Sequence, residues 1–169
     1  FIHGTLYSWG NYCPPQEIID EYQMANGLPI ADAASGYDDQ DPYTGRENRF
    51  YDFIVYNACE YKQDWMSEAD IIYTTIEIPP WSSDWGPYHG YDFTGETGYY
   101  YKKRLDNLNP PGNNLCGMNH VYYRYAEVLL GYAEAQNEAV GPDPSVYEAV
   151  NAIRQRPGTD LPPLPAGLS

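Results

Sequence analysis

A pair of predicted helices in the last third of the chain constrains the fold most. Residues 122–139 are rich in Ala, Leu and Glu, and one face carries a helical stripe of Tyr122, Ala126, Leu129, Ala133 and Gln136. Gly141 and Pro142 end this pattern. Ser145 and Glu148 then form a capping-box pattern, which predicts a second helix ending at 157–158, with the apolar stripe Val146, Val150 and Ile153.

The region 122–158 has the length of one tetratricopeptide-type helix pair, about 34 residues. One such pair cannot bury both of its faces alone, so its packing partners must come from elsewhere in a longer protein or from another chain. Although 169 residues fit one domain, we therefore expect this chain to be a fragment of a larger one.

Residues 1–121 are predicted to form a loop-rich region with few regular elements. Pro15 fits the first position of a short helix over 15–25, since its missing N–H costs nothing there. Three segments rich in aromatic and β-branched residues are predicted as strands, namely 50–57, 71–78 and 99–104. The segments 30–48, 79–98 and 107–119 are predicted as loops, and 159–169 as a Pro-rich tail. The expected fold class is mainly α, with long irregular loops and a few short β-strands.

Charge and cysteine usage exclude several functions. The chain has 24 acidic and 9 basic residues and a net charge of −15, which argues against nucleic-acid binding. No run of 18 apolar residues predicts a membrane-spanning helix. The cysteines lack the spacing of a disulfide framework or a zinc site, and the histidines lack metal-ligand spacing, so neither a metal nor a cofactor is expected: Cys13, Cys59, Cys116, His3, His89 and His120.

Aromatic residues with a polar tip are in excess, at 19 Tyr and 4 Trp against 4 Phe. Their densest group lies in a Gly- and Pro-rich loop and combines two Trp, two Tyr and two Asp: Trp81, Asp84, Trp85, Tyr88, Tyr91 and Asp92. Flat rings flanked by carboxylates suit sugars, which have apolar C–H faces and polar rims. We predict a carbohydrate site here, with Trp65 and Tyr37 as second-rank candidates. The alternative is that these rings only anchor a long loop to the helices beneath it.

Two further groups of polar residues remain open to more than one interpretation. Asp38, Asp39 and Asp41 could bind calcium, although their spacing is not that of an EF-hand, and a solvated or capping role is favoured. Pairs of carboxylates suited to glycoside hydrolysis can always be found among 24 acids, but no local motif singles out an acid and a nucleophile. An enzyme is therefore not expected.

Five short motifs follow one another in a characteristic order. They read PQEIIDEYQMANG at 15–27, YTGRENRFYDFIVYN at 43–57, TGYYYKK at 97–103, RYAEVLLGYAEAQNE at 124–138 and VNAIRQRPGTDLPPL at 150–164. Together they resemble the SusD-like (RagB/SusD) family of nutrient-binding outer-membrane lipoproteins. The chain departs from the family pattern at Glu47 and Asn48, where Asp-Pro is usual, at Ala58, where Gly is usual, and at Pro157, where Ala is usual.

The resemblance implies a tetratricopeptide-like helical scaffold whose long excursions carry the ligand site. It implies non-catalytic capture of an oligosaccharide at the cell surface and delivery to a SusC-type TonB-dependent transporter in the outer membrane. The family attaches to that membrane through a lipidated Cys, a role that none of the three Cys here can be assigned. Capture of peptides instead of glycans is the alternative within the family, and a glycoside hydrolase or a purely structural piece is the alternative outside it.

Overall fold

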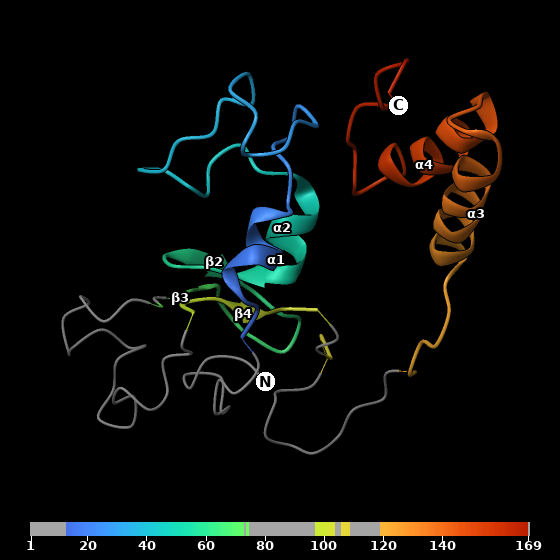
Figure 1. The fold of residues 1–169 in the computed structure, drawn as a ribbon. Coiled ribbons are helices and arrows are strands. Elements are labelled where there is room, and N and C mark those ends of the chain that lie inside the picture. The colour runs from blue at the N-terminus through green and yellow to red at the C-terminus, as the bar shows by residue number, and fades with distance from the viewer. Residues whose placement is uncertain (1–12, 73, 75–96, 104–105, 109–118, 169) are drawn as a thin grey trace. The chain divides into compact units, whose positions relative to one another are not determined.

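A computed structural model describes residues 13–72, 74, 97–103, 106–108 and 119–168 (Figure 1). Their regular elements, in chain order, are α1 (Gln16–Asp20), α2 (Asn48–Phe53), β1 (Ile54–Val55), β2 (Cys59–Tyr61), β3 (Asp70–Ile72), β4 (Tyr100–Tyr101), α3 (Tyr125–Val140) and α4 (Pro144–Arg154). Helical residues outnumber strand residues, which confirms the expected mainly α class with a few short strands. The chain divides into two compact units, one of Phe1–Ile19 with Phe50–Met118 and the other of Asp20–Arg49 with Asn119–Ser169.

The first unit is built on two short antiparallel ladders. β1 pairs with β4, with Val55 opposite Tyr100, and β2 pairs with β3, with Cys59 opposite Ile72. Side chains alternate along β2, so that Cys59 and Tyr61 point inward and Glu60 outward. The buried cluster that holds the ladders together consists of Val55, Cys59, Tyr61, Ile72 and Tyr100.

The strand predicted over 50–57 is only partly correct. Asn48–Phe53 is a helical turn, and only Ile54 and Val55 form a strand. The turn buries Phe50, whose ring stacks on Tyr56 with centroids 5.2 Å apart. β-propensity mainly reflects the fit of a side chain to a paired surface, and here only the β-branched residues meet a partner strand.

The helix predicted over 15–25 ends early, at Asp20. The backbone beyond it bonds to residues far along the chain: the N–H of Ala25 donates to the carbonyl of Gly45 at 2.8 Å, and the N–H of Glu47 donates to that of Gln23 at 2.9 Å. Met24 also forms a β-bridge with Arg46. These long-range bonds replace the helical bonds that residues 21–25 would otherwise make.

The helix pair of the second unit follows the predicted stripes closely. Along α3, Ala133 is buried and Ala126, Leu129 and Gln136 are half-buried, while the other helical residues are exposed. Tyr122 does not belong to the stripe, because it precedes the helix and is 82% exposed. The stripe of α4 is half-buried as predicted, and Ala149 adds a buried position between its members.

The cap of α4 is Asp143, not Ser145 as the capping-box pattern predicts. The Asp143 carboxylate accepts the backbone N–H of Ser145 at 2.7 Å and that of Val146 at 3.3 Å, and Pro144 occupies the first turn. Asp and Ser are both strong N-caps, and Pro is preferred at the first helical position. The Asp-Pro pair therefore moves the helix start two residues earlier than a cap at Ser145 would.

Candidate functional site

The structure places only part of the predicted carbohydrate site. Trp81, Asp84, Trp85, Tyr88, Tyr91 and Asp92 lie outside the described residues. The described residues on either side of this segment are close together, since a Cβ on Gly98 would lie 3.9 Å from the Thr74 Oγ1. Trp65 is half-buried and packs against the core cluster of the first unit. Its proposed contact with ligand stays a prediction.

Tyr37 lines a hollow in the surface of the second unit. The hollow has a volume of about 450 Å³, within the range of small-molecule sites, and its wall includes Ile30, Asp32, Ser35, Tyr37 and Asp39. Tyr37 is half-buried, whereas Asp32 and Asp39 are exposed. The hollow therefore combines one aromatic ring with carboxylate and hydroxyl oxygens.

Buried polar contacts define the shape of this hollow. Ser35 is buried, its carbonyl accepts the Asn26 side-chain amide at 3.0 Å, and its hydroxyl donates to the carbonyl of Ile30 at 3.3 Å. The same hydroxyl accepts the N–H of Tyr37 at 3.2 Å, which ties the backbone of the aromatic residue to the wall. The sequence did not lead us to predict Ser35 as part of the site. The feature that could have indicated it is the Gly-Tyr-Asp turn that follows Ser35 directly.

A buried arginine lies next to the Tyr37 ring. The Arg46 guanidinium carbon is 5.6 Å from the ring centroid, within the range of a cation–π contact. Its Nη1 donates to the carbonyl of Pro42 at 3.1 Å, and its Nη2 donates to that of Tyr22 at 2.9 Å. Arg46 therefore links the ring to two other parts of the 20–49 loop.

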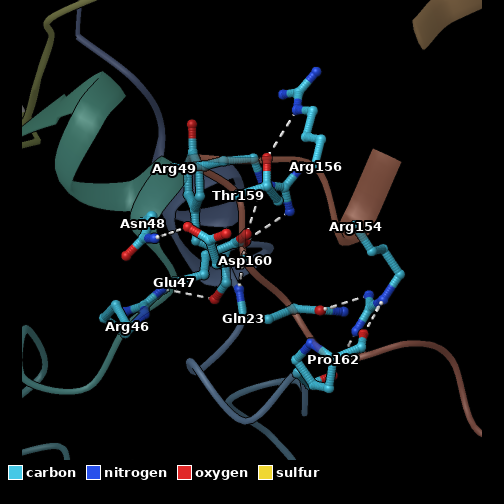
Figure 2. Close-up of polar contacts among 12 residues, drawn as sticks. Gln23, Arg46, Glu47, Asn48, Arg49, Arg154, Arg156, Thr159, Asp160 and Pro162 are labelled. Atoms are coloured by element: carbon cyan, nitrogen blue, oxygen red, sulfur yellow. Dashed lines mark hydrogen bonds and ion pairs between the residues drawn. The ribbon is translucent and has the colours of Figure 1, made fainter. Parts of the chain in front are cut away.

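A network of charged side chains holds the base of this loop (Figure 2). The buried Glu47 carboxylate accepts the backbone N–H of Gln23 at 2.9 Å and the Arg49 guanidinium at 2.6 and 2.8 Å. The amide side chain of Asn48 donates to the Asp160 carboxylate at 3.2 Å. A buried carboxylate needs such partners, because burying it without them is costly.

Arg154 of α4 ties the loop to the helix pair (Figure 2). Its guanidinium donates to the Gln23 side-chain oxygen at 2.9 Å, to the Pro162 carbonyl at 2.9 Å and to the Gly27 carbonyl at 3.4 Å. Burial lowers the pKa of Arg154, while the nearby charge of Glu47 opposes that change. An arginine stays protonated despite such a shift, so the contacts persist at neutral pH. The hollow is thus part of a loop supported by a regular element.

The acidic cluster of this loop contributes to turn structure. The Asp38 carboxylate accepts the N–H of Gln40 at 2.9 Å, and its carbonyl accepts the N–H of Asp41 at 3.0 Å. The Asp38 side chain therefore has a capping role of the kind favoured over calcium binding, while the roles of the Asp39 and Asp41 side chains stay predictions. Among the residues that the structure describes, no group of three or more His, Cys, Asp or Glu is arranged to hold a metal ion. Within the same residues, none of the helices is both long enough and apolar enough to span a bilayer.

Comparison with known proteins identifies the family. The sequence profile of the SusD family matches residues 3–165. A SusD-like protein from Bacteroides fragilis NCTC 9343 is 30% identical and superposes with a TM-score of 0.69, over 95% of this chain and 31% of that protein. A SusD-like carbohydrate binding protein from the same strain has 22% identity and a TM-score of 0.58, over 92% of this chain and 29% of that one, and shows a shared fold.

No curated protein matches the chain by sequence. The chain spans about a third of the length of the solved structures that it matches. The match to the family profile extends over nearly all 169 residues, and the fold superposes on a SusD-like protein over 95% of this chain. This chain therefore belongs to the SusD family.

Proposed function

We propose that this chain belongs to a cell-surface protein that captures oligosaccharides and does not cleave them. Membership of the SusD family over residues 3–165 carries the proposal. A similar fold in a SusD-like carbohydrate binding protein supports the ligand class. In this proposal the protein is anchored to the outer membrane by a lipid and delivers its ligand to a SusC-type TonB-dependent transporter.

The ligand contacts that we propose come from two places in the chain. In this proposal Trp81 and Trp85 stack against sugar rings, Tyr88 and Tyr91 contribute further aromatic contacts, and the carboxylates of Asp84 and Asp92 accept hydrogen bonds from sugar hydroxyls. The Tyr37 hollow provides a further contact, because its ring is bordered by oxygen acceptors and its volume of about 450 Å³ suits a small part of a glycan.

Affinity electrophoresis against a panel of polysaccharides tests this function. The parent protein should be retarded by at least one glycan. Trp81→Ala and Trp85→Ala should each weaken that binding by about tenfold or more, which corresponds to roughly 1.4 kcal/mol. Tyr37→Ala should weaken it less. Tyr123→Ala, which removes an exposed tyrosine outside the predicted contacts, is the matched control and should bind as the parent does.

Each alternative function has a distinct outcome in this experiment. Binding of peptides in place of every glycan would replace the glycan proposal with peptide capture. Release of shorter sugars from the gel polysaccharide would indicate a hydrolase. If the variants at Trp81 and Trp85 bind like the parent, the proposed site is wrong even if the protein binds glycans. Copurification with a TonB-dependent transporter tests the delivery step separately.

A further inference from the structure

Asn26 and Gly27 form the only Asn-Gly pair in the sequence, and they lie in the turn that follows Met24. An Asn that precedes Gly is prone to deamidation, because Gly has no side chain to hinder the attack of its backbone nitrogen on the Asn Cγ. Asn26 is exposed, so water reaches it. The pair therefore has both the chemistry and the access that a modification site needs.

In the folded loop, hydrogen bonds hold both of the groups that would react. The attacking atom is the Gly27 nitrogen, and its N–H donates to the carbonyl of Met24 at 2.8 Å. The Asn26 Nδ2 donates to the carbonyl of Ser35 at 3.0 Å, and the Asn26 Oδ1 accepts the N–H of Leu28 at 3.1 Å. The Gly27 nitrogen is free to attack the Asn26 Cγ only after these bonds break, so the reaction requires local opening of the turn.

Arg154 of α4 holds this turn closed. Its guanidinium donates to the Gly27 carbonyl at 3.4 Å and to the Gln23 side-chain oxygen at 2.9 Å. Its Nη2 also packs closely on Gly27, since a Cβ there would lie 2.7 Å from it. Opening of the turn breaks these contacts as well. The rate of deamidation in the folded protein therefore measures how often this part of the 20–49 loop opens.

We propose that Asn26 is a deamidation site whose conversion irreversibly alters the Tyr37 hollow. The Gly27 nitrogen forms a bond to the Asn26 Cγ and gives up its proton to water. The bond between Cγ and Nδ2 breaks, and the nitrogen leaves as ammonia after taking a proton from solvent. Water then opens the resulting succinimide at either carbonyl, which yields aspartate or isoaspartate. Water is the only other reactant, and nothing is oxidised or reduced.

Neither product can remake the contact with Ser35. A carboxylate accepts hydrogen bonds but does not donate them, so the donor to the Ser35 carbonyl is lost and two acceptors face each other. Isoaspartate also inserts a methylene into the backbone beside Gly27, where a Cβ would lie 2.7 Å from the Pro162 Cγ. Because the Ser35 hydroxyl accepts the N–H of Tyr37, the wall of the hollow loosens. This inference holds whether or not the hollow contacts a glycan.

Peptide mass spectrometry of the polypeptide as its cell makes it follows conversion at Asn26 during incubation in mildly alkaline buffer. In urea Asn26 should convert readily, and in native buffer it should convert more slowly by about tenfold or more. Arg154→Lys should raise the native rate several-fold and leave the rate in urea unchanged. Arg156→Lys, which changes a residue that bonds within its own turn, is the matched control and should follow the parent in both conditions.

Two results of this experiment would overturn the proposal. Absence of conversion at Asn26 in urea would show that it is not a deamidation site. Equal rates in urea and in native buffer would show that the folded turn does not control the reaction. An unchanged native rate in Arg154→Lys would overturn the role of Arg154 in holding the turn closed.

Asn26→Asp reproduces the aspartate product and tests the consequence for the hollow. It should speed hydrogen exchange at the Tyr37 amide, whose N–H donates to the Ser35 hydroxyl. Asn137→Asp adds the same charge on an exposed part of α3 and should leave that exchange unchanged. Exchange at Tyr37 that is as slow in Asn26→Asp as in the parent would overturn the link between the modification and the hollow.

Discussion

Gly27 shows how a single position joins two distant segments. Its φ is +81°, which favours glycine, and a Cβ there would lie 2.7 Å from both the Arg154 Nη2 and the Pro162 Cγ. The turn after Met24 therefore requires both a left-handed backbone and the absence of a side chain. In the sequence, Gly27 is only the last residue of the motif at 15–27.

Replacing Gly27 with Ala should destabilise the protein more than the same change at Gly36. Gly36 has a similar φ of +77°, but a Cβ there would meet nothing within 4 Å, so only the backbone cost of about 1–3 kcal/mol applies. Urea unfolding of both variants measures the difference in their free energies of unfolding. An equal decrease of that free energy in the two variants would show that Arg154 and Pro162 move aside without cost.

The Asp143 cap predicts a pH dependence of α4. Hydrogen bonds from Ser145, followed by that from Gln136, lower the pKa of the Asp143 carboxyl from 3.8 to about 2 in the folded protein. Because the folded pKa is depressed, the stabilisation is complete above about pH 4 and is lost as the pH falls toward 2.

Circular dichroism between pH 5 and pH 2 checks this prediction. Asp143→Asn keeps a capping oxygen that does not titrate, so this variant should lose less helix over that range than the parent. An identical acid transition in both proteins would contradict the assignment of Asp143 as a titrating cap.

At the scale of elements, the long helix α3 was predictable from sequence and the short elements were not. A 16-residue helix shows its buried stripe in sequence, because the same side must face α4 along its whole length. Strands β1 and β4 have only two residues each. Two residues are too few to show the alternation of buried and exposed side chains that would distinguish β1 from the helical turn before it. This is why the segment 50–57 was predicted as one strand.

Arg154 should matter more to the 20–49 loop than its neighbour Arg156. Arg154→Lys removes the fork that reaches Gln23, Gly27 and Pro162, at an expected loss of about 1.5–3 kcal/mol, whereas Arg156 bonds within its own turn to Thr159. Limited proteolysis should cut faster within 20–49 in the Arg154 variant, with Arg156→Lys as the control. Equal cleavage rates would contradict the anchoring role.

At the scale of the whole molecule, the net charge of −15 acts against compactness. Twenty-four acidic residues repel one another in the folded chain, and added salt screens that repulsion. The thermal unfolding midpoint should therefore rise by a few degrees between low salt and about 0.5 M NaCl. Differential scanning calorimetry checks this, with sucrose at matched osmolality as the control for effects other than screening. A falling midpoint would contradict charge repulsion as the dominant effect.

The sequence by itself determined the class of fold, the positions of α3 and α4, and the stripe along which they pack. These features depend on local propensity and on helical period, both of which are properties of neighbouring residues. The five motifs also identified the family. Tyr37 was recognisable as a candidate from its residue type alone, but its hollow was not.

Only the tertiary structure decided which distant segments meet. It groups residues 20–49 with the helix pair, brings Arg154 to Gln23 and Gly27, and ends α1 at Asp20. Each of these outcomes depends on hydrogen bonds between residues twenty or more positions apart, such as those of Glu47 with Gln23. No local pattern records such bonds, because their free energy appears only once both partners are in place.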